Sequence, residues 1–302
     1  MNRPNVLVVM PLFNAQPFLK KAIESIYSQT YKDFIFLIVN DSSTDGSELL
    51  AEEYSKFGLI LMHQKNSGPG SIMNMATNYA IENKIEYIAR FDADDIALPN
   101  RLEKQIELME KYPYTAACSS NCYYIDAINE ETIGTSTVPV SPLLIQWEIK
   151  TGLRGLIQGS TLFRTEPLRK IGGYREKFKL AEETDVFLRL NEMYELRNSS
   201  DFLMKIRLHK NSLSVGNSKK NTQYLYFALD CAKRRTQKKP EIEFNQFIAN
   251  LPIIRRFQIW HEEFFLRIWR YYLIRRNPIY LVLLIFLDLR RSLFRIMRML
   301  SM

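Results

Sequence analysis

The chain has 302 residues and ordinary globular composition, with 46% hydrophobic residues, 25% charged residues and a formal net charge of +8. This length suffices for one large domain or two small ones. The sequence shows no internal repeat and no low-complexity tract, which excludes a repeat protein. Three cysteines, Cys118, Cys122 and Cys231, are odd in number and lack the paired spacing of a zinc site, so we expect reduced thiols in a reducing cytosol.

Short apolar runs alternate with helical patterns through the first 120 residues. The runs predict strands at residues 6–10, 34–39, 59–62 and 87–91, and the patterns between them predict helices at 16–29, 45–56 and 71–82. The first run is short and leads directly into Pro11, so it is interpreted as a strand and not as part of a signal peptide. Alternating strands and helices imply a parallel, doubly wound sheet.

After residue 115 the pattern becomes mixed. It predicts a strand at 115–124, a helix at 141–150, a short strand at 160–164, a turn at 171–174 and a helix at 182–193. The polar and basic stretch from Ser218 to Lys239 predicts a domain boundary.

Polar residues follow three of the predicted strands, at 11–14, 40–43 and 92–95. In a doubly wound sheet, ligands bind beyond the carboxyl ends of the strands. These three strand ends therefore predict a binding site at one edge of the sheet.

Asp92, Asp94 and Asp95 are the strongest chemical signal of the sequence. Three anions within four residues repel one another, and Asp carboxylates are suitable ligands for Mg2+ or Mn2+, with diphosphate oxygens completing the coordination. An acidic turn that caps the helix near Pro99 explains the same residues, and spacing alone does not choose between the two. A Rossmann or P-loop enzyme is disfavoured because the glycine patterns of both are missing.

The ordered motifs resemble the inverting glycosyltransferases of family 2, which have the GT-A fold. The matching segments lie at residues 8–14, 40–47, 66–70, 91–95 and 181–189, within roughly residues 5–215. The resemblance implies an α/β fold of GT-A type, with a mostly parallel doubly wound sheet flanked by helices. It implies a glycosyltransferase domain at 1–217, divided into a nucleotide-binding half at 1–115 and an acceptor half at 116–217.

The resemblance also assigns a donor site for a nucleotide sugar. The implied donor-binding residues are Pro11, Phe13, Asn14, Asp41, Asn66, Gly68, Asp92, Arg207 and His209. Asp41 would accept a hydrogen bond from a uracil-type base, and Asp94 with Asp92 would bind Mn2+ or Mg2+, which stabilises the departing diphosphate. Gln158 and Gly159 would form the floor of the acceptor pocket, although a simple turn before a strand explains them as well.

The catalytic base is implied by the acidic residues at 182–185. Relatives carry Glu-Asp where this chain has Glu182-Glu183, so Glu183 is the expected base and Asp185 the alternative. Acids in a first helical turn also stabilise a helix dipole, so a structural role competes with the chemical one. A second departure is Met73, where many relatives carry an arginine in the donor pocket. Lys65 or Arg90 are the candidates to replace that cation.

The positive charge concentrates at the end of the chain. Residues 251–302 contain ten Arg, no Lys and three acids, whereas the first 250 residues are close to neutral. On a helical projection, the arginines between Arg290 and Arg298 occupy one face and the apolar residues between Leu289 and Leu300 the other, which is typical of a helix lying in a membrane interface. The run at 279–287 is too short to span a bilayer. A nucleic-acid partner is disfavoured because no recognised nucleic-acid motif is present.

The aromatic spacing of the same region has a simpler interpretation. Five residues recur at helical intervals, which predicts core packing: Phe257, Trp260, Phe264, Ile268 and Tyr272. Trp260 and Tyr272 would equally suit the headgroup zone of a membrane. Residues 218–302 are therefore expected to form a helical, Arg-rich, amphipathic region that associates with membranes.

The sequence thus predicts a metal-dependent, inverting glycosyltransferase with Mn2+ or Mg2+ as cofactor. It would move a sugar from a nucleoside-diphosphate donor, with a UDP-sugar preferred, to a glycan or lipid-linked acceptor in cell-surface polysaccharide synthesis. We expect a cytoplasmic protein held peripherally on the inner face of the cell membrane. The alternatives are a catalytically inactive nucleotide-sugar-binding protein and a membrane-surface adaptor.

Overall fold

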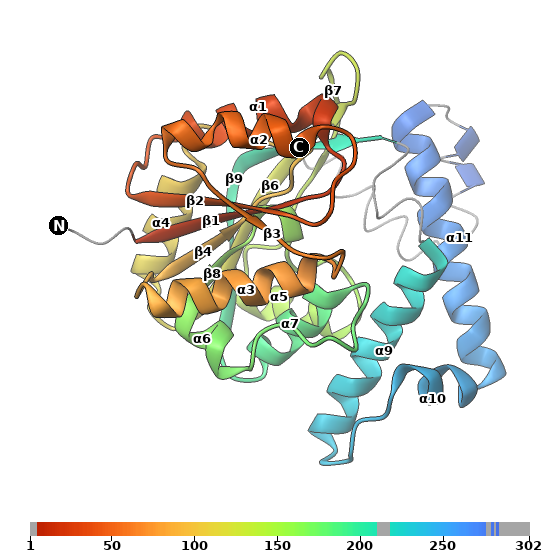
Figure 1. Cartoon of the computed structure of the whole chain (residues 1–302). Coiled ribbons are helices and arrows are strands. Elements are labelled where there is room, and N and C mark those ends of the chain that lie inside the picture. Colours follow the sequence, from red (N-terminus) through yellow and green to blue (C-terminus); the bar gives the residue numbers. More distant parts are fainter. Residues whose placement is uncertain (1–4, 210–217, 276–278, 281, 284–302) are drawn as a thin grey trace.

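The computed structural model describes residues 5–209, 218–275, 279–280 and 282–283. Within these ranges a nine-stranded mixed sheet runs through the molecule, with helices on both of its faces (Figure 1). The predicted α/β class, with a sheet flanked by helices, is confirmed.

The first part of the chain follows the predicted alternation closely. Its elements are β1 (Val6–Leu12), α1 (Gln16–Tyr27), β2 (Phe34–Asn40), α2 (Ser47–Glu53), the 3-10 helix η1 (Ser55–Phe57), β3 (Ile60–His63), α3 (Pro69–Glu82), β4 (Tyr87–Arg90), β5 (Ile96–Ala97) and α4 (Arg101–Lys111). The helix predicted at 45–56 begins later because the Asp45 carboxylate accepts hydrogen bonds from the backbone N–H groups of Gln16 and Ser47. Asp45 thus ties the start of α2 to that of α1.

The second part contains elements that periodicity did not predict. It comprises β6 (Thr115–Asp126), β7 (Thr132–Ser136), α5 (Pro142–Lys150), the 3-10 helix η2 (Gln158–Ser160), β8 (Leu162–Arg164), α6 (Thr165–Lys170), α7 (Glu182–Asn191), β9 (Glu195–Leu208), α9 (Ser218–Thr236), α10 (Phe244–Ala249) and α11 (Ile253–Arg275). Strands β7 and β9 and helix α6 were not predicted, and neither was β5 of the first part. The 14 residues of β9 do not alternate cleanly between apolar and polar, because the strand lies between β6 and β5 and its register with β6 shifts.

The sheet has the order β3-β2-β1-β4-β8-β6-β9-β5, and β7 pairs with β6. Strands β3, β2, β1 and β4 are mutually parallel. Strand β8 is antiparallel to both of its neighbours, so β6 and β9 again run in the direction of β1. The carboxyl ends of β1, β2, β4 and β9 therefore lie at the same edge of the sheet.

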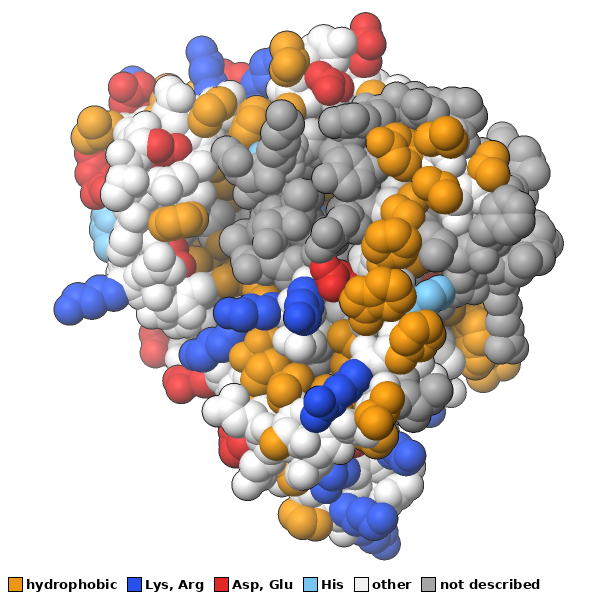
Figure 2. All heavy atoms as spheres, turned by 90° about the vertical axis from the view of Figure 1, so that its right-hand side faces the viewer, with side chains coloured by type: hydrophobic (Ala, Val, Ile, Leu, Met, Phe, Trp, Pro, Cys, Tyr) orange, Lys and Arg blue, Asp and Glu red, His pale blue; other side chains and the backbone are white. Residues whose placement is uncertain are grey.

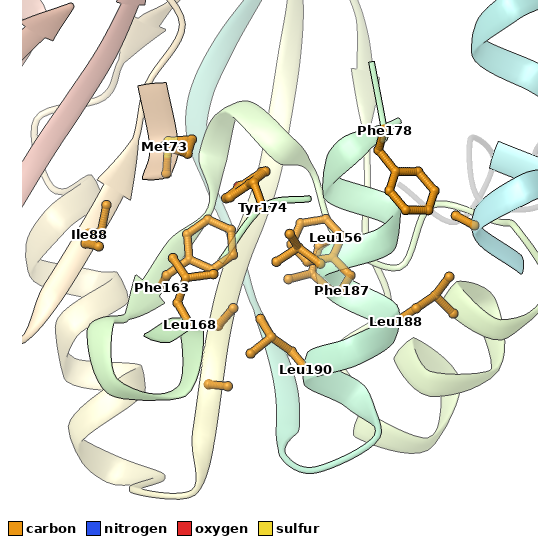
Figure 3. Close-up of a cluster of buried hydrophobic side chains, with 14 of the residues drawn as sticks. Met73, Ile88, Leu156, Phe163, Leu168, Tyr174, Phe178, Phe187, Leu188 and Leu190 are labelled. Carbon is orange, nitrogen blue, oxygen red and sulfur yellow. The ribbon is translucent and has the colours of Figure 1, made fainter. Parts of the chain in front are cut away.

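Two hydrophobic clusters occupy the two faces of the sheet because successive side chains of a strand point to opposite sides. On β1, Val8 packs in the cluster that includes α1 and α4, whereas Leu7 and Val9 pack in the cluster that includes α3, α6 and α7. Figure 3 shows part of the second cluster, with Ile88 of β4 and Phe187 of α7 among its members. This packing places the first turn of α7 near the carboxyl end of β4.

Helices α9, α10 and α11 contribute to that same second cluster. Phe227 of α9, Phe247 of α10 and Ile259 of α11 are buried in it. The rings of Phe227 and Phe178 stack with centroids 5.0 Å apart. The hydrophobic cluster therefore continues across the predicted boundary at residue 217, and the division of the chain there stays a prediction.

The outer face of α11 differs from the expected core packing. Phe257 and Trp260 are 58% and 53% exposed, and Phe264 is exposed as well, so the prediction of core packing was wrong for these three residues. Ile268 is buried and Tyr272 is partly buried, as that prediction requires. The helix instead packs through Ile259 and Phe265 on its other side. The amphipathic helix predicted between Leu289 and Leu300 lies outside the described residues.

Candidate functional site

The loops that follow β1 and β2 are joined by hydrogen bonds between side chains and backbone. Asn14 adopts a left-handed conformation, with φ of 50°, which asparagine tolerates better than most residues. Its backbone N–H donates to the Ser43 hydroxyl at 3.1 Å, and its side-chain oxygen accepts from the Thr44 N–H at 2.8 Å. Phe13 is exposed beside it and Pro11 is half-buried. Sequence segments far apart thus form one surface, as the strand-end prediction requires.

Asp41 joins the end of β2 to the loop after β3. One carboxylate oxygen accepts from the Gln64 side chain at 2.7 Å and from the Ser67 N–H at 2.9 Å, and the other accepts from the Gly68 N–H at 3.0 Å. Gly68 has φ of 82°, where a side chain would be strained. The predicted donor residues Asp41 and Gly68 therefore touch each other. Asn66, in the same loop, is exposed.

Met73 does not face this surface. It is fully buried in the hydrophobic cluster between the sheet and α3 (Figure 3). The next residue, Asn74, both accepts from the backbone N–H of Tyr174 and donates to its carbonyl, at 2.7 and 2.8 Å. Met73 stands where many relatives carry a donor-binding arginine, but it packs in the core. The adjacent Asn74 holds the 171–174 turn in place.

The acidic residues after β4 lie against the end of β9. The Asp94 carboxylate is 2.8 Å from Nε2 of His209, and the Asp94 carbonyl accepts from Nε of Arg207 at 2.9 Å. The Asp95 carboxylate accepts from the backbone N–H of Arg207 at 2.9 Å. Strand β9, which the sequence did not reveal, therefore fixes the acidic turn in place.

Asp95 is buried and does not cap α4, whose cap residue is Asn100. Burial, and after it the charges of Asp94 and Asp92, raise the pKa of Asp95 well above its ordinary value. By contrast, the Asp92 and Asp94 side chains are 33% and 29% exposed. The two carboxylates that remain open to solvent are those predicted to bind metal.

The donor set of the acidic turn suits a metal that is completed by substrate. Among the residues that the structure describes, no three His, Cys, Asp or Glu side chains converge as a cage for a metal ion. A Mg2+ site typically uses only one or two carboxylates together with phosphate oxygens and water. Asp94 and Asp92 supply that number of carboxylates at a partly open edge, and they therefore fit such an ion.

Arg207 and His209 differ in how free they are to meet a ligand. Arg207 is buried, with Nη2 donating to Glu130 at 2.8 Å and the guanidinium lying 4.8 Å from the ring centroid of Phe18. His209 is only partly buried, and its ring packs 5.0 Å from that of Phe18. Of the two predicted phosphate contacts, His209 lies in the more open position.

Gln158 and Gly159 lie in η2, directly against the acidic turn. A methyl group added to Gly159 would approach a carboxylate oxygen of Asp92 to 2.8 Å and one of Asp95 to 3.3 Å. A side chain at Gly159 would therefore displace the Asp92 carboxylate, so one of the two predicted acceptor residues lies beside a predicted metal residue.

The first turn of α7 carries buried carboxylates with different partners. Glu183 forms an ion pair with Arg90, and both side chains are buried. Asp185 is fully buried and accepts from Nε of Arg175 at 2.9 Å and Nε of Arg189 at 2.8 Å. Burial raises the pKa of Glu182, against the opposing charge of Arg90. The two candidate bases are thus both paired, one with a single arginine and the other with two.

The sequence did not predict the contacts that two arginines of the site make. Arg90 was considered only as a replacement cation for the donor pocket, yet it contacts Glu183 and Asp92. Arg101 is fully buried beneath the acidic turn, where it donates to the Arg90 carbonyl at 2.6 Å and burial lowers its pKa to about 10. Arg101 follows the acidic cluster closely in the sequence, but no local pattern marks a buried arginine.

Comparison with known proteins identifies the family of the chain. The family model described as "Glycosyl transferase family 2" matches residues 7–172. An uncharacterised glycosyltransferase from Methanocaldococcus jannaschii is 33% identical over 239 residues, which cover 76% of this chain and 79% of the relative. The putative glycosyltransferase EpsE from Bacillus subtilis is 28% identical over 211 residues, which cover 68% and 73%.

Solved structures show the same fold. A structure of S. aureus TarS in complex with UDP-GlcNAc has a TM-score of 0.62 at 17% identity, covering 90% of this chain and 74% of that one. A mannosyltransferase from Pyrobaculum calidifontis, in complex with GDP-Man and Mn2+, has a TM-score of 0.57 at 17% identity, covering 93% and 75%. The fold is of the GT-A type, and the chain belongs to glycosyl transferase family 2.

Proposed function

We propose that the protein transfers a sugar from a nucleoside-diphosphate donor, with inversion, to a glycan or lipid-linked acceptor. The observation that carries this proposal is the meeting of two kinds of carboxylate at one sheet edge. Partly exposed Asp92 and Asp94 lie at the end of β4. Buried Glu183 forms an ion pair with Arg90, the last residue of the same strand. A transferase of this kind needs a site for the leaving diphosphate and a base for the acceptor hydroxyl.

The donor would lie over the ends of β1, β2 and β4. Pro11, Phe13 and Asn14 would meet the nucleoside beside Asp41, and Asn66 and Gly68 would border it. A Mn2+ or Mg2+ ion held by Asp94 and Asp92 would supply positive charge to the leaving diphosphate. His209 lies next to Asp94 and would contact the phosphates. A uridine nucleotide is our preferred donor, in line with the complex of TarS with UDP-GlcNAc.

Glu183 is the preferred base. Its carboxylate would accept the acceptor's hydroxyl proton while the hydroxyl oxygen bonds to the anomeric carbon and the bond to the diphosphate breaks. Asp185 is the weaker candidate because both of its oxygens contact arginine in a fully buried position. Gly159 borders the acidic turn, and it would contact the acceptor together with its neighbour Gln158.

The donor site is tested by measuring thermal stability with UDP or GDP in the presence of Mn2+, Mg2+ or EDTA. A ligand that binds only the folded state stabilises it by about 2.7 kcal/mol at a concentration of 100 Kd. We expect a metal-dependent rise with UDP that Asp94→Ala abolishes. Asp33→Ala, an exposed carboxylate just before β2, is the matched control and should retain the rise.

The reaction is tested by UDP release from UDP-N-acetylglucosamine and other UDP-sugars. Glu183→Gln should retain the stability rise with UDP and lose release by about 100-fold or more. Full release in Glu183→Gln would remove this residue from the role of base. No stability rise with either nucleotide would contradict a donor site and favour an adaptor without transfer.

We also propose attachment to an anionic membrane surface through the C-terminal region. Residues 218–302 carry 17 Lys or Arg and six Asp or Glu, a net charge of +11. Residues 1–217 carry 24 Lys or Arg and 27 Asp or Glu, a net charge of −3.

An exposed apolar stripe runs along α11, within about 60° of the helix circumference. It consists of Ile253, Phe257, Trp260 and Phe264. Figure 2 shows apolar side chains gathered along this helix. Aromatic residues and excess positive charge together suit the headgroup region. None of the helices in the described ranges has the length and apolar content to cross a bilayer.

Point variants test this attachment better than truncation, because α10 and α11 bury Phe247 and Ile259 in the core. Sedimentation with vesicles of phosphatidylglycerol and phosphatidylcholine should fall strongly in Trp260→Ser/Phe264→Ser and should be weak with phosphatidylcholine alone. Tyr114→Ser is the control, because Tyr114 is an 84% exposed aromatic residue that is far from α11 in the sequence. Equal sedimentation of all three proteins would contradict the role of the stripe.

A further inference from the structure

Arg90 occupies the junction between the two parts of the candidate site. It is the last residue of β4 and pairs with Val9 of β1 in the sheet. Because side chains alternate along a strand, Arg90 points to the same face as Ile88, where α7 packs. The guanidinium therefore lies against the first turn of α7. Arg90 also precedes Asp92 by only two residues in the chain.

The contacts of Arg90 are with carboxylates on both sides. Its Nη1 faces Oε1 of Glu183, and its Nε lies 3.3 Å from an Asp92 oxygen. No hydrogen bond to the second oxygen of Glu183, Oε2, comes from the part of the chain that the structure describes. One oxygen of Glu183 is thus held by Arg90, and the other is left for a substrate hydroxyl.

Burial makes this pairing obligatory. The side chains of Arg90 and Glu183 are each 5% exposed, so neither charge is stabilised by bulk water. Removing one partner of a buried ion pair leaves the other charge uncompensated, whereas an exposed pair contributes little. Arg90 therefore determines where the carboxylate of Glu183 lies.

The other cations near this edge have different partners. Arg207 donates to Glu130 and to the Asp94 carbonyl, and Arg101 donates to Gln105 and to the Arg90 carbonyl. Arg175 and Arg189 contact Asp185. Among the described residues, Arg90 is the cation that contacts both a strand-end carboxylate and Glu183.

We propose that Arg90 is a positioning residue for sugar transfer: it holds Glu183 in register with Asp92, so that the base and the donor's diphosphate site keep a fixed separation. The proposal rests on the role of Glu183 as base. A base must lie within hydrogen-bond reach of the proton that it accepts, and small displacements of catalytic groups cost large factors in rate. Arg90 itself makes no bond to the reacting atoms.

The test compares Arg90→Gln, Arg90→Lys, Glu183→Gln and the double variant Arg90→Gln/Glu183→Gln. The readouts are kcat for UDP release from UDP-N-acetylglucosamine and the Kd for UDP with Mn2+. We expect Arg90→Gln to lower kcat by about 100-fold with little change in Kd, and Arg90→Lys to recover part of the loss. The double variant should be no slower than Glu183→Gln, because Arg90 acts through Glu183.

Arg164→Gln is the matched control. Arg164 lies on β8, next to β4, and pairs with Glu86 just before the start of β4, away from the site. Its kcat per folded protein should equal that of the wild type. If Arg90→Gln does not fold, the other two variants carry the test. Arg90→Lys keeps both charges of the buried pair, and the double variant removes both.

Three results would overturn the proposal. They are wild-type kcat in Arg90→Gln and Arg90→Lys, a loss of UDP affinity that accounts for the rate, and a double variant that multiplies the two single losses. Failure of the underlying assignment has another signature, since Glu183→Gln would then release UDP at the wild-type rate whatever Arg90 does.

Discussion

The donor side and the α7 side of the site are held together by different forces. On the donor side, neutral hydrogen bonds at the surface join Asn14, Ser43 and Thr44, and the Asp41 carboxylate accepts from backbone N–H groups of the next loop. On the α7 side, buried ion pairs hold Glu183 and Asp185. A surface hydrogen bond contributes about 1 kcal/mol, whereas breaking a buried ion pair costs about 3 to 5 kcal/mol. We therefore expect substitutions to affect mainly ligand binding on the donor side, and folding as well on the α7 side.

The largest effect is expected for Asp185→Asn. This change leaves Arg175 and Arg189 without their shared carboxylate in a buried position, so the free energy of unfolding should fall by about 3 to 5 kcal/mol in urea denaturation. Asp230→Asn breaks the equivalent pair with Arg234, four residues on, in the partly exposed helix α9. A loss there as large as at Asp185 would contradict the larger cost assigned to a buried ion pair.

A smaller, pH-dependent effect is expected for Glu241→Gln. Burial alone would raise the pKa of Glu241, but hydrogen bonds from Lys177 and Arg235 and the charge of Arg175 lower it to about 2. A depressed carboxyl pKa stabilises the folded state above the ordinary value of 4.5, and this stabilisation is lost as the pH falls toward 2. The variant should be less stable than the wild type by about 2 kcal/mol at pH 7, with a smaller difference at pH 3.

Gly159→Ala tests the contact between η2 and the acidic turn. The added methyl group would press on the Asp92 carboxylate, so stability should fall by about 1 to 2 kcal/mol and UDP should bind less tightly in the presence of Mn2+. Gly70→Ala is the control, because its new methyl group would meet Tyr174 and Glu182 at ordinary distances within helix α3. Unchanged metal-dependent binding in Gly159→Ala would separate η2 from the donor site.

The smallest effect is expected for Ser43→Ala, which removes the acceptor for the Asn14 N–H. That group is exposed and can bond water, so stability should fall by less than about 1 kcal/mol. UDP affinity, measured by calorimetry, should weaken because the two loops that carry Phe13 and Asp41 lose one connection. A fall in stability comparable to that of Asp185→Asn would show that substitutions on the donor side cost as much stability as substitutions on the α7 side.

The parts of the fold that sequence predicted are those with local signals. The strands β1, β2 and β4 are short apolar runs that end in polar residues, and parallel topology then places those ends together. Strand β9 has no such pattern, because the partner strands β6 and β5, and not its own periodicity, determine its burial.

Side-chain pairing within the site follows a similar division. Motifs selected the acidic residues that are candidates for the site, but they did not reveal that Glu183 pairs with Arg90 or that Asp185 lies between two arginines. Such contacts depend on how α7 packs against β4. Helical spacing likewise identified one face of α11 but not that Phe257 and Trp260 point outward, because periodicity does not say which apolar face meets the core.

The network around Glu241 has a consequence for genetics. Glu241 lies just before α10, and it pairs with Arg175, which in turn pairs with Asp185, two residues from Glu183. Arg235 connects Glu241 to Glu192 just after α7. A premature stop codon shortly after residue 217 would therefore remove the counter-ion of Glu192 next to α7. On the proposal that Glu183 of α7 is the base, turnover should be lost even in an assay without any membrane.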